Sequence, residues 1–247
     1  MKPYRAVIFD LFNTVALWQP DRMPRFTWRG ETRPSTLGVL RELLAEAVPS
    51  LAFDDFYNAF ERANSALARE REVTLREIPS RERFSRTLIE AGFEAGSTEH
   101  LAERLSLSHM EVLGQASSIP SAHREWLLAL SRHYRIGLIS NFDHAPTALA
   151  ILERDKVDSI FEHMLISDSH GWRKPAKRIF DDALGALGVD PGDALYVGDS
   201  VDDDVVGAQN AGIDVAWVNA REHELPAGVT QPTYTINSIL DLAQYLN

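Results

Sequence analysis

The hydrophobic and polar positions of the chain fall into three successive patterns. The first is a short apolar run over Tyr4–Phe9 that stops at Asp10, as in a strand buried in a parallel sheet. From about Ser35 to Gln115, apolar residues instead recur every three or four positions, which predicts amphipathic helices. The predicted helices cover 36–48, 54–71, 80–91 and 98–114, and no strand is expected among them.

The third pattern begins at Pro120, where predicted helices and strands alternate. Helices are expected at 121–133, 145–153, 176–187, 201–211 and 238–246, and strands at 134–140, 163–166, 194–197, 214–218 and 233–236. This alternation indicates a parallel sheet with crossover helices. The simplest architecture is a doubly wound (Rossmann-like) α/β core formed by residues 1–17 and 118–247. An all-helical domain, residues 18–117, is inserted after the first strand and is a candidate lid.

Several predicted strands lead into polar residues, and the carboxyl ends of parallel strands gather at one edge of a sheet. The polar sets are Asp10 with Thr14, Ser140 with Asn141, Lys174, and Asp199 with Asp202–Asp204. We therefore expect carboxylates, hydroxyls and one lysine to meet there. The aspartates at 202–204 have a second explanation, because acidic residues also favour the first turn of a helix.

This set of side chains suits phosphoryl transfer. Neighbouring carboxylates repel one another, and oxygen ligands without histidine or cysteine favour a hard cation such as Mg²⁺. With the cation bound, Asp10 is a candidate nucleophile toward phosphorus. Lys174, Ser140 and Thr14 are then candidates to hold the phosphoryl oxygens. The expected intermediate is an aspartyl-phosphate, which water later hydrolyses.

Composition narrows the range of partners. The 36 acidic and 25 basic residues give a formal charge of -11, which argues against nucleic acid and anionic membranes and leaves a small-molecule substrate. The chain has no cysteine, which excludes disulfides, and its N-terminal run lacks the pattern of a secretory signal. We therefore expect a cytoplasmic protein. The sequence does not indicate an oligomeric state.

Four segments carry a family resemblance: FDLFNT, LISNFD, RKPAKRIF and YVGDSVDDDVVGAQNAG. They resemble, in order, the four motifs of the haloacid dehalogenase (HAD) superfamily, and the insert resembles its helical cap. The resemblance implies that Asp10 is the nucleophile, that Asp199 is a magnesium ligand, and that Asp204 is a second ligand or its support. It implies that Ser140 and Lys174 bind phosphate.

The same resemblance extends to three further residues, and a fourth is a candidate because it lies next to one of the motifs. Asn141 is expected beside Ser140 in the substrate site, and Thr14 is expected to orient the nucleophile loop. Trp172, next to the third motif, is a candidate member of the substrate pocket. Phe12 stands where phosphatases of the superfamily usually have a second aspartate that moves protons. The Phe12 carbonyl remains a candidate metal ligand and its ring a substrate contact, but the loss of an acid-base group costs about 10²–10⁴-fold in rate.

Two alternatives to a phosphatase follow from Phe12. The 2-haloacid dehalogenases also have an aromatic residue there and need no metal, but their fourth motif is rich in serine and asparagine. A dehalogenase also needs an arginine for the substrate carboxylate, and five arginines precede the first long helix of the insert or lie in it: Arg22, Arg25, Arg29, Arg33 and Arg41. The other alternative is a catalytically weak member that binds a phosphorylated ligand or a protein partner.

Overall fold

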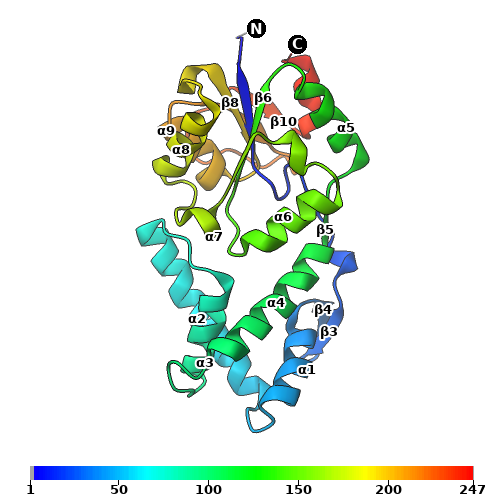
Figure 1. The fold of residues 1–247 in the computed structure, drawn as a ribbon, viewed down its shortest axis with the longest axis vertical. Coiled ribbons are helices and arrows are strands. Elements are labelled where there is room, and N and C mark those ends of the chain that lie inside the picture. The colour runs from blue at the N-terminus through cyan, green and yellow to red at the C-terminus, as the bar shows by residue number, and fades with distance from the viewer. Residues whose placement is uncertain (1–2, 247) are drawn as a thin grey trace. The chain divides into compact units, whose positions relative to one another are not determined.

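The computed structural model describes residues 3–246, which form two compact units. The first unit joins the chain up to Trp18 with the chain from Ser118 onward, and the second covers Gln19–Ser117. Two short strands, β2 (Leu17–Trp18) and β5 (Ser117–Ser118), lie where the chain passes between the units and form a two-stranded sheet. Figure 1 shows the elements of both units.

The first unit is built on a six-stranded sheet in the order β10-β9-β8-β1-β6-β7. Every pair of neighbouring strands is parallel. The strands are β1 (Ala6–Phe9), β6 (Arg135–Ser140), β7 (His163–Ile166), β8 (Ala194–Gly198), β9 (Asp214–Val218) and β10 (Tyr234–Ile236). After β1 the chain builds outward to β7 and then returns to β8, so the strand order reverses between β1 and β8. Ligands of doubly wound sheets bind at such a reversal, and the predicted fold class is confirmed.

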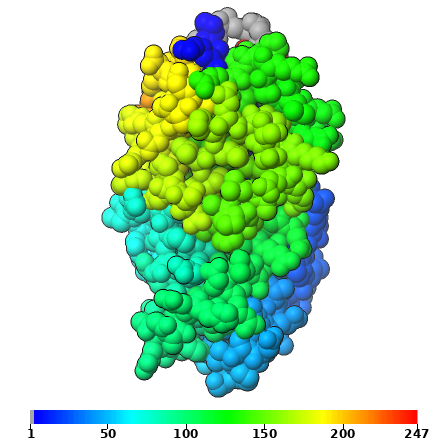
Figure 2. All heavy atoms as spheres, viewed as in Figure 1, coloured from blue at the N-terminus to red at the C-terminus, as the bar shows by residue number. Residues whose placement is uncertain are grey.

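Side chains of the strands alternate between two hydrophobic layers, as a pleated sheet requires. Val7 and Phe9 of β1 face one layer, and Ala6 and Ile8 face the other. Helices α5 (Ser121–Leu130) and α6 (Ala145–Arg154) contribute to the first layer, while α8 (Lys177–Leu187) and α9 (Gly207–Asn210) contribute to the second. Figure 1 shows α8 and α9 on one side of the sheet and α5 on the other. In Figure 2 the green to yellow part of the chain covers most of the visible face of this unit.

The second unit packs four helices and a hairpin around its own core. The helices are α1 (Leu37–Ala47), α2 (Phe53–Thr74), α3 (Ser80–Glu90) and α4 (Glu99–Gln115). Buried leucines and phenylalanines from all four helices meet in one cluster, which includes Leu40, Phe56, Phe84 and Leu105. These helices lie within a few residues of the predicted ones, because their apolar faces recur at the helical period.

The hairpin corrects the expectation of an all-helical insert. Strands β3 (Arg25–Trp28) and β4 (Glu31–Pro34) pair antiparallel across a two-residue turn in which Arg29 and Gly30 both have positive φ, 50° and 85°. This is the geometry of the tight hairpin turn that Asn-Gly or Asp-Gly usually forms. Arg-Gly is a weak signal for that turn, and the alternating run is short.

The other differences from the predicted elements are local. The predicted helix over 201–211 begins with a π-helical segment, Val201–Val206, and continues as α9. The last predicted helix is a 3-10 helix over Ile239–Gln244. Among the described residues, no helix is both long and apolar enough to cross a membrane.

Candidate active site

Three neighbouring strands of the first unit lead into residues whose side chains can take part in a reaction. Asp10 follows β1, Ser140 ends β6, and Asp199 follows Gly198 at the end of β8. Since β6, β1 and β8 are adjacent and parallel, these residues share one edge of the sheet. That edge lies at the reversal of strand order, where the sequence predicted the site.

The loop after β1 is closed by its own backbone. The Ala16 N–H donates to the Leu11 carbonyl at 2.7 Å, and the Asn13 N–H donates to the Ala16 carbonyl at 2.7 Å. Asn13 adopts a positive φ of 58°, which asparagine tolerates better than most residues. The Asp10 N–H donates to Val197 of β8 at 2.8 Å. These bonds close the loop and tie the Asp10 backbone to β8.

Lys174 lies at the centre of the site and is buried, with 2 % of its surface exposed. Its ammonium group donates to Asp10 Oδ1 and to Asp204 Oδ1, both at 2.6 Å. It also donates to the Tyr196 hydroxyl at 2.9 Å and to the Ile139 carbonyl at 3.2 Å. A buried charge of this kind is tolerated only with such partners. Lys174 therefore joins the ends of β1, β6 and β8.

Asp204 holds the other side of this cluster and is 1 % exposed. Besides Lys174, its Oδ1 accepts from the Tyr196 hydroxyl at 2.9 Å, and its Oδ2 accepts from the Ser200 N–H at 2.9 Å. The close approach requires Gly198, since a Cβ there would lie 2.4 Å from the Asp204 carboxyl group. Glycine is thus needed at the end of β8 for steric reasons.

The three aspartates at 202–204 have different surroundings. Asp202 is exposed, as expected for an acid in the first turn of a helix. Asp203 accepts from the Asn141 amide at 3.1 Å, and Asp204 belongs to the lysine cluster. The two explanations that the sequence allowed therefore apply to different members of the run.

Two carboxyl groups of the site, Asp10 and Asp199, have raised pKa values. Burial raises the pKa of Asp10 to about 7, against the opposing effect of Lys174 and with the help of the Asp204 charge. Burial and Asp204 raise the pKa of Asp199 to about 6. For Lys174, burial opposes the charge, but Asp10 and Asp204 outweigh it and raise its pKa. Asp10 and Asp204 thus share one ammonium group, and with Asp199 nearby the site carries excess negative charge.

The residues fit a divalent cation. Asp10, Asp199 and Asp204 each offer a carboxylate oxygen within 4.8 Å of the other two. Oxygen-only ligands with excess negative charge favour Mg²⁺. Asp204 already accepts three hydrogen bonds, so it has less capacity to spare than the other two. Asp204 as a second ligand or its support, and metal binding by the Phe12 carbonyl, both stay predictions.

Two buried hydroxyls at the site lack a protein partner. Thr14 and Ser140 are 1 % and 0 % exposed, and neither Oγ atom forms a hydrogen bond within the part of the chain that the structure describes. An unsatisfied buried hydroxyl costs free energy. Their positions after β1 and at the end of β6 suit the expected contacts with a phosphoryl group.

The side-chain amide of Asn141 forms hydrogen bonds with other residues of the protein. Its amide oxygen accepts from the Lys174 N–H at 2.8 Å, and its amide nitrogen donates to the Lys174 carbonyl at 2.9 Å and to Asp203. Both N–H groups of the amide are therefore used. The geometry makes Asn141 a positioning residue for Lys174, and contact of its side chain with substrate stays a prediction.

Trp172 and Phe12 have aromatic or cationic neighbours. The Arg178 guanidinium lies 5.9 Å from the centre of the Trp172 ring. The Phe12 and Phe142 rings lie 4.7 Å apart. Substrate contact by either residue stays a prediction.

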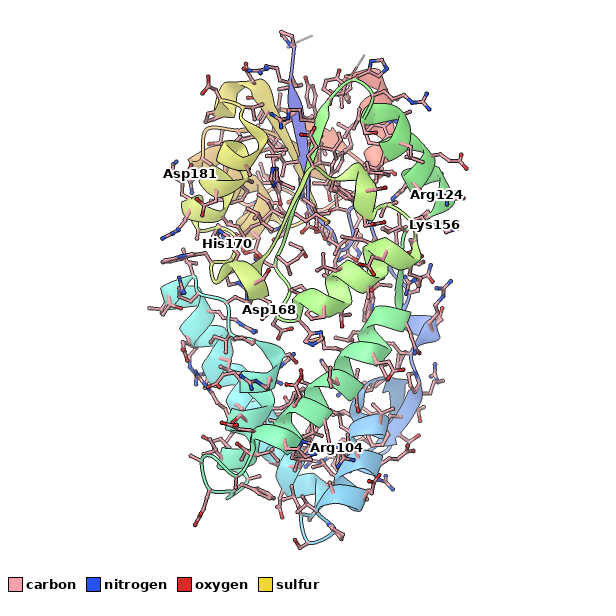
Figure 3. The ribbon with its side chains drawn as sticks, in the orientation of Figure 1. Arg104, Arg124, Lys156, Asp168, His170 and Asp181 are labelled. Atoms are coloured by element: carbon pink, nitrogen blue, oxygen red, sulfur yellow. The ribbon has the colours of Figure 1, made fainter. Side chains whose placement is uncertain are left out.

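The loop that holds Phe142 is itself tied to α7 (Ser167–His170). The Phe142 N–H donates to Ser167 Oγ at 2.9 Å, and the Ala145 N–H donates to Asp168 Oδ2 at 2.7 Å. Figure 3 shows Asp168 at α7, beside the start of α6. The loop of the second motif is therefore tied to α7 at Phe142 and at Ala145.

Sequence reasoning missed two residues of the site. Tyr196, fully buried in β8, links Lys174 to Asp204. Trp217 in β9 donates from Nε1 to the Asp199 carbonyl at 3.0 Å. A signal for Tyr196 was present, because a tyrosine in an otherwise apolar strand needs a partner for its hydroxyl.

Comparison with known proteins gives three findings. Residues 4–212 match the model of the haloacid dehalogenase-like hydrolase family. Pyrimidine 5'-nucleotidase YjjG of Escherichia coli is 38% identical over 121 residues, 49% of this chain and 53% of that protein. Glyceraldehyde 3-phosphate phosphatase of Pyrococcus abyssi is 37% identical over 99 residues, 40% of this chain and 41% of that protein. The match thus spans about half the length of these relatives or less.

Solved structures share the fold over almost the whole chain. A 2-haloacid dehalogenase from Pseudomonas syringae has a TM-score of 0.75 at 24% identity, covering 98% of this chain and 97% of that one. The HAD-hydrolase YfnB from Bacillus subtilis, bound to magnesium, has a TM-score of 0.65 at 21% identity and covers 100% of both chains. At this identity the likeness shows a common fold and no more.

Proposed function

Since the chain belongs to the haloacid dehalogenase-like hydrolases, we propose that it is a magnesium-dependent phosphatase of small phosphomonoesters in which Asp10 is the nucleophile. The observation that carries this proposal is the set of three carboxylates, Asp10, Asp199 and Asp204, around one buried lysine. A metal-free reaction at Asp10 has no need of Asp199. The phosphatase names of the relatives with 38% and 37% identity support the same substrate class.

The chemistry assigned to the chain's own residues is as follows. An Asp10 oxygen attacks phosphorus, the bond between phosphorus and the ester oxygen breaks, and the departing alcohol takes a proton from solvent. Water then attacks phosphorus, the bond to Asp10 breaks, and inorganic phosphate leaves. Lys174 and the hydroxyls of Thr14 and Ser140 stabilise the phosphoryl oxygens.

Mg²⁺, when bound, neutralises charge on the phosphoryl group and lowers the pKa of the neighbouring carboxyl groups. The second effect favours the ionised Asp10 nucleophile, because burial raises the pKa of this carboxyl group. Asp199 is the carboxylate with most capacity to hold the ion. The Trp217 side chain fixes the Asp199 backbone through its carbonyl.

The test is phosphate release from a panel of phosphomonoesters, with Mg²⁺ or with EDTA. We expect release that requires Mg²⁺ and falls at least about 10³-fold in Asp10→Asn. The matched control is Asp181→Asn, which makes the same change at an exposed carboxylate of α8 that pairs with Lys177 and is labelled in Figure 3. Release that survives EDTA, or that persists in Asp10→Asn, contradicts the proposal.

A second candidate, dehalogenation of a short 2-haloacid, is favoured by Phe12. The half-buried Phe12 ring packs against Phe142, which gives an apolar surface in place of a proton-transfer group. Asp10 would displace halide from carbon, and water would hydrolyse the resulting ester. Halide release that is indifferent to EDTA, with no phosphate release, would favour this candidate. Ligand binding without any turnover would favour a catalytically weak member instead.

A further inference from the structure

A pocket of about 670 Å³ opens within the first unit, beside the proposed metal site. Asp199 and Asn13 line the pocket next to the site, and most residues of the chain from Trp217 to Pro226 line it as well. The pocket therefore lies at the carboxyl ends of β8 and β9, at the same edge of the sheet as Asp10.

The wall after β9 is a closed loop. Asn219 is 8 % exposed, and its amide both accepts from the His223 N–H at 2.9 Å and donates to the His223 carbonyl at 3.0 Å. The Glu222 N–H donates to the Asn219 carbonyl at 3.0 Å. These three bonds hold Arg221 and His223 at the pocket.

The remaining lining is largely apolar. Trp18 leaves 38 % of its surface exposed, as does Leu17, and both line the pocket with Trp217 and Val201. Small-molecule sites commonly combine an apolar lining of this kind with a few placed polar groups and occupy about 300–1,000 Å³. An exposed tryptophan in such a wall offers a flat face on which a ring can stack.

We propose that this pocket binds the leaving group of the substrate and that this group carries an aromatic or heteroaromatic ring, stacked on Trp18. The inference rests on the proposed function and narrows its substrate class. A three-carbon alcohol would leave most of the volume unfilled. The exposed Arg221, His223 and Glu224 place donors and acceptors at the rim, where a heteroaromatic ring presents polar edges.

Two substrates that differ only in the ring test this directly: a nucleoside 5'-monophosphate and ribose 5-phosphate. We expect the wild-type protein to favour the nucleotide in kcat/KM by at least about fivefold, which is the low end for stacking of a base on an aromatic side chain. Trp18→Ala should remove that preference by lowering kcat/KM for the nucleotide at least about fivefold more than kcat/KM for ribose 5-phosphate, while Trp18→Phe should keep it. Equal use of both substrates by the wild-type protein overturns the inference.

A binding measurement separates this inference from the proposed function. Calorimetry with the nucleoside itself, which has no phosphate, requires no turnover, and ribose is the control. Binding of the nucleoside that weakens at least about fivefold in Trp18→Ala supports the pocket even if no phosphomonoester is hydrolysed. Absence of nucleoside binding overturns the inference, even if phosphate is released from other esters.

Discussion

The two units of this protein each bury a titratable side chain, and they do so in opposite ways. In the first unit, Lys174 stays charged because Asp10 and Asp204 are both 2.6 Å away. In the second, His109 of α4 is 8 % exposed and contacts the Thr36 hydroxyl at 2.9 Å. Burial and the charge of Arg83 lower its pKa to about 3, so it stays neutral.

The difference distinguishes a buried group that can take part in chemistry, Lys174, from one that only packs, His109. The carboxylates around Lys174 come from segments that meet at the ends of several strands. Together they carry more negative charge than Lys174 balances, so the site favours binding of a further cation. His109 is satisfied by one hydroxyl and packs at 5.5 Å against the Phe84 ring. A buried titratable group is therefore a sign of function only where other charged groups converge on it.

The largest effect is expected from restoring a proton-transfer group to the first unit. Phe12→Asp should raise phosphate release by about 10²–10⁴-fold, which is the usual contribution of general acid-base catalysis. Steady-state kinetics with an alkyl phosphomonoester, whose leaving group needs a proton, would show it. Phe12→Asn is the matched control, since asparagine has a shape similar to that of aspartate but transfers no proton. An equal gain in both variants would mean that the Phe12 ring merely obstructs the site.

Removal of the central charge should come next. Lys174→Met keeps the length of the side chain but leaves Asp10 and Asp204 without their counter-charge, so we expect a loss of about 3–5 kcal/mol in the free energy of unfolding. Urea denaturation at pH 7 measures it. His109→Gln, at the neutral centre of the second unit, should cost clearly less under the same conditions. Similar losses in the two variants would remove the distinction between the centres.

The extent to which these centres could be predicted follows from how far apart their residues lie in the chain. Asp10, Ser140 and Asp199 each end a strand, so a local apolar run followed by a polar residue was enough to place them. The predicted strands were right for the same reason. The β3–β4 hairpin was missed because its turn, Arg29–Gly30, lacks the usual residues.

The strand ends were expected to meet, but the individual hydrogen bonds between side chains of distant segments could not be predicted. Asn141 was expected beside Ser140, and the structure adds its hydrogen-bond partners, which are the backbone of Lys174, 33 residues later, and Asp203. Strand order and the path of each loop decide which residues face each other across a site. The local pattern of apolar and polar residues determines neither of them. The roles of Tyr196 and Trp217 emerged only from those contacts.

The neutral His109 should make the free energy of unfolding depend on pH. The ordinary histidine pKa of 6.5 applies to the unfolded chain, and that of folded His109 is about 3. Between these values the unfolded chain binds a proton that the folded chain does not, so stability falls as pH falls, by up to about 1.4 kcal/mol per pH unit. Above pH 6.5 both states are neutral at this residue, and no dependence on His109 remains.

This is measured by urea denaturation at pH 7 and pH 5. Between these values His109→Gln should lose about 2 kcal/mol less than the wild-type protein. The control is His100→Gln, at an exposed histidine of the same helix, which should follow the wild-type protein. A His109→Gln variant with the wild-type dependence on pH would show that His109 is not kept neutral by burial.

The smallest effect is expected at Tyr196, whose hydroxyl joins Lys174 to Asp204. Tyr196→Phe removes that hydroxyl but leaves the lysine and both carboxylates, so we expect a loss of about 1–3 kcal/mol in the free energy of unfolding. The matched control is Tyr4→Phe, because the Tyr4 hydroxyl also donates to a carboxylate, Asp214, at 2.8 Å but lies outside the lysine cluster. Both variants should lose stability.

Only Tyr196→Phe should also change the Mg²⁺ concentration that gives half-maximal phosphate release, because only Tyr196 shares Asp204 with the proposed metal site. An unchanged Mg²⁺ dependence in Tyr196→Phe would make Tyr196 a packing residue, which would place it with His109 rather than with Lys174.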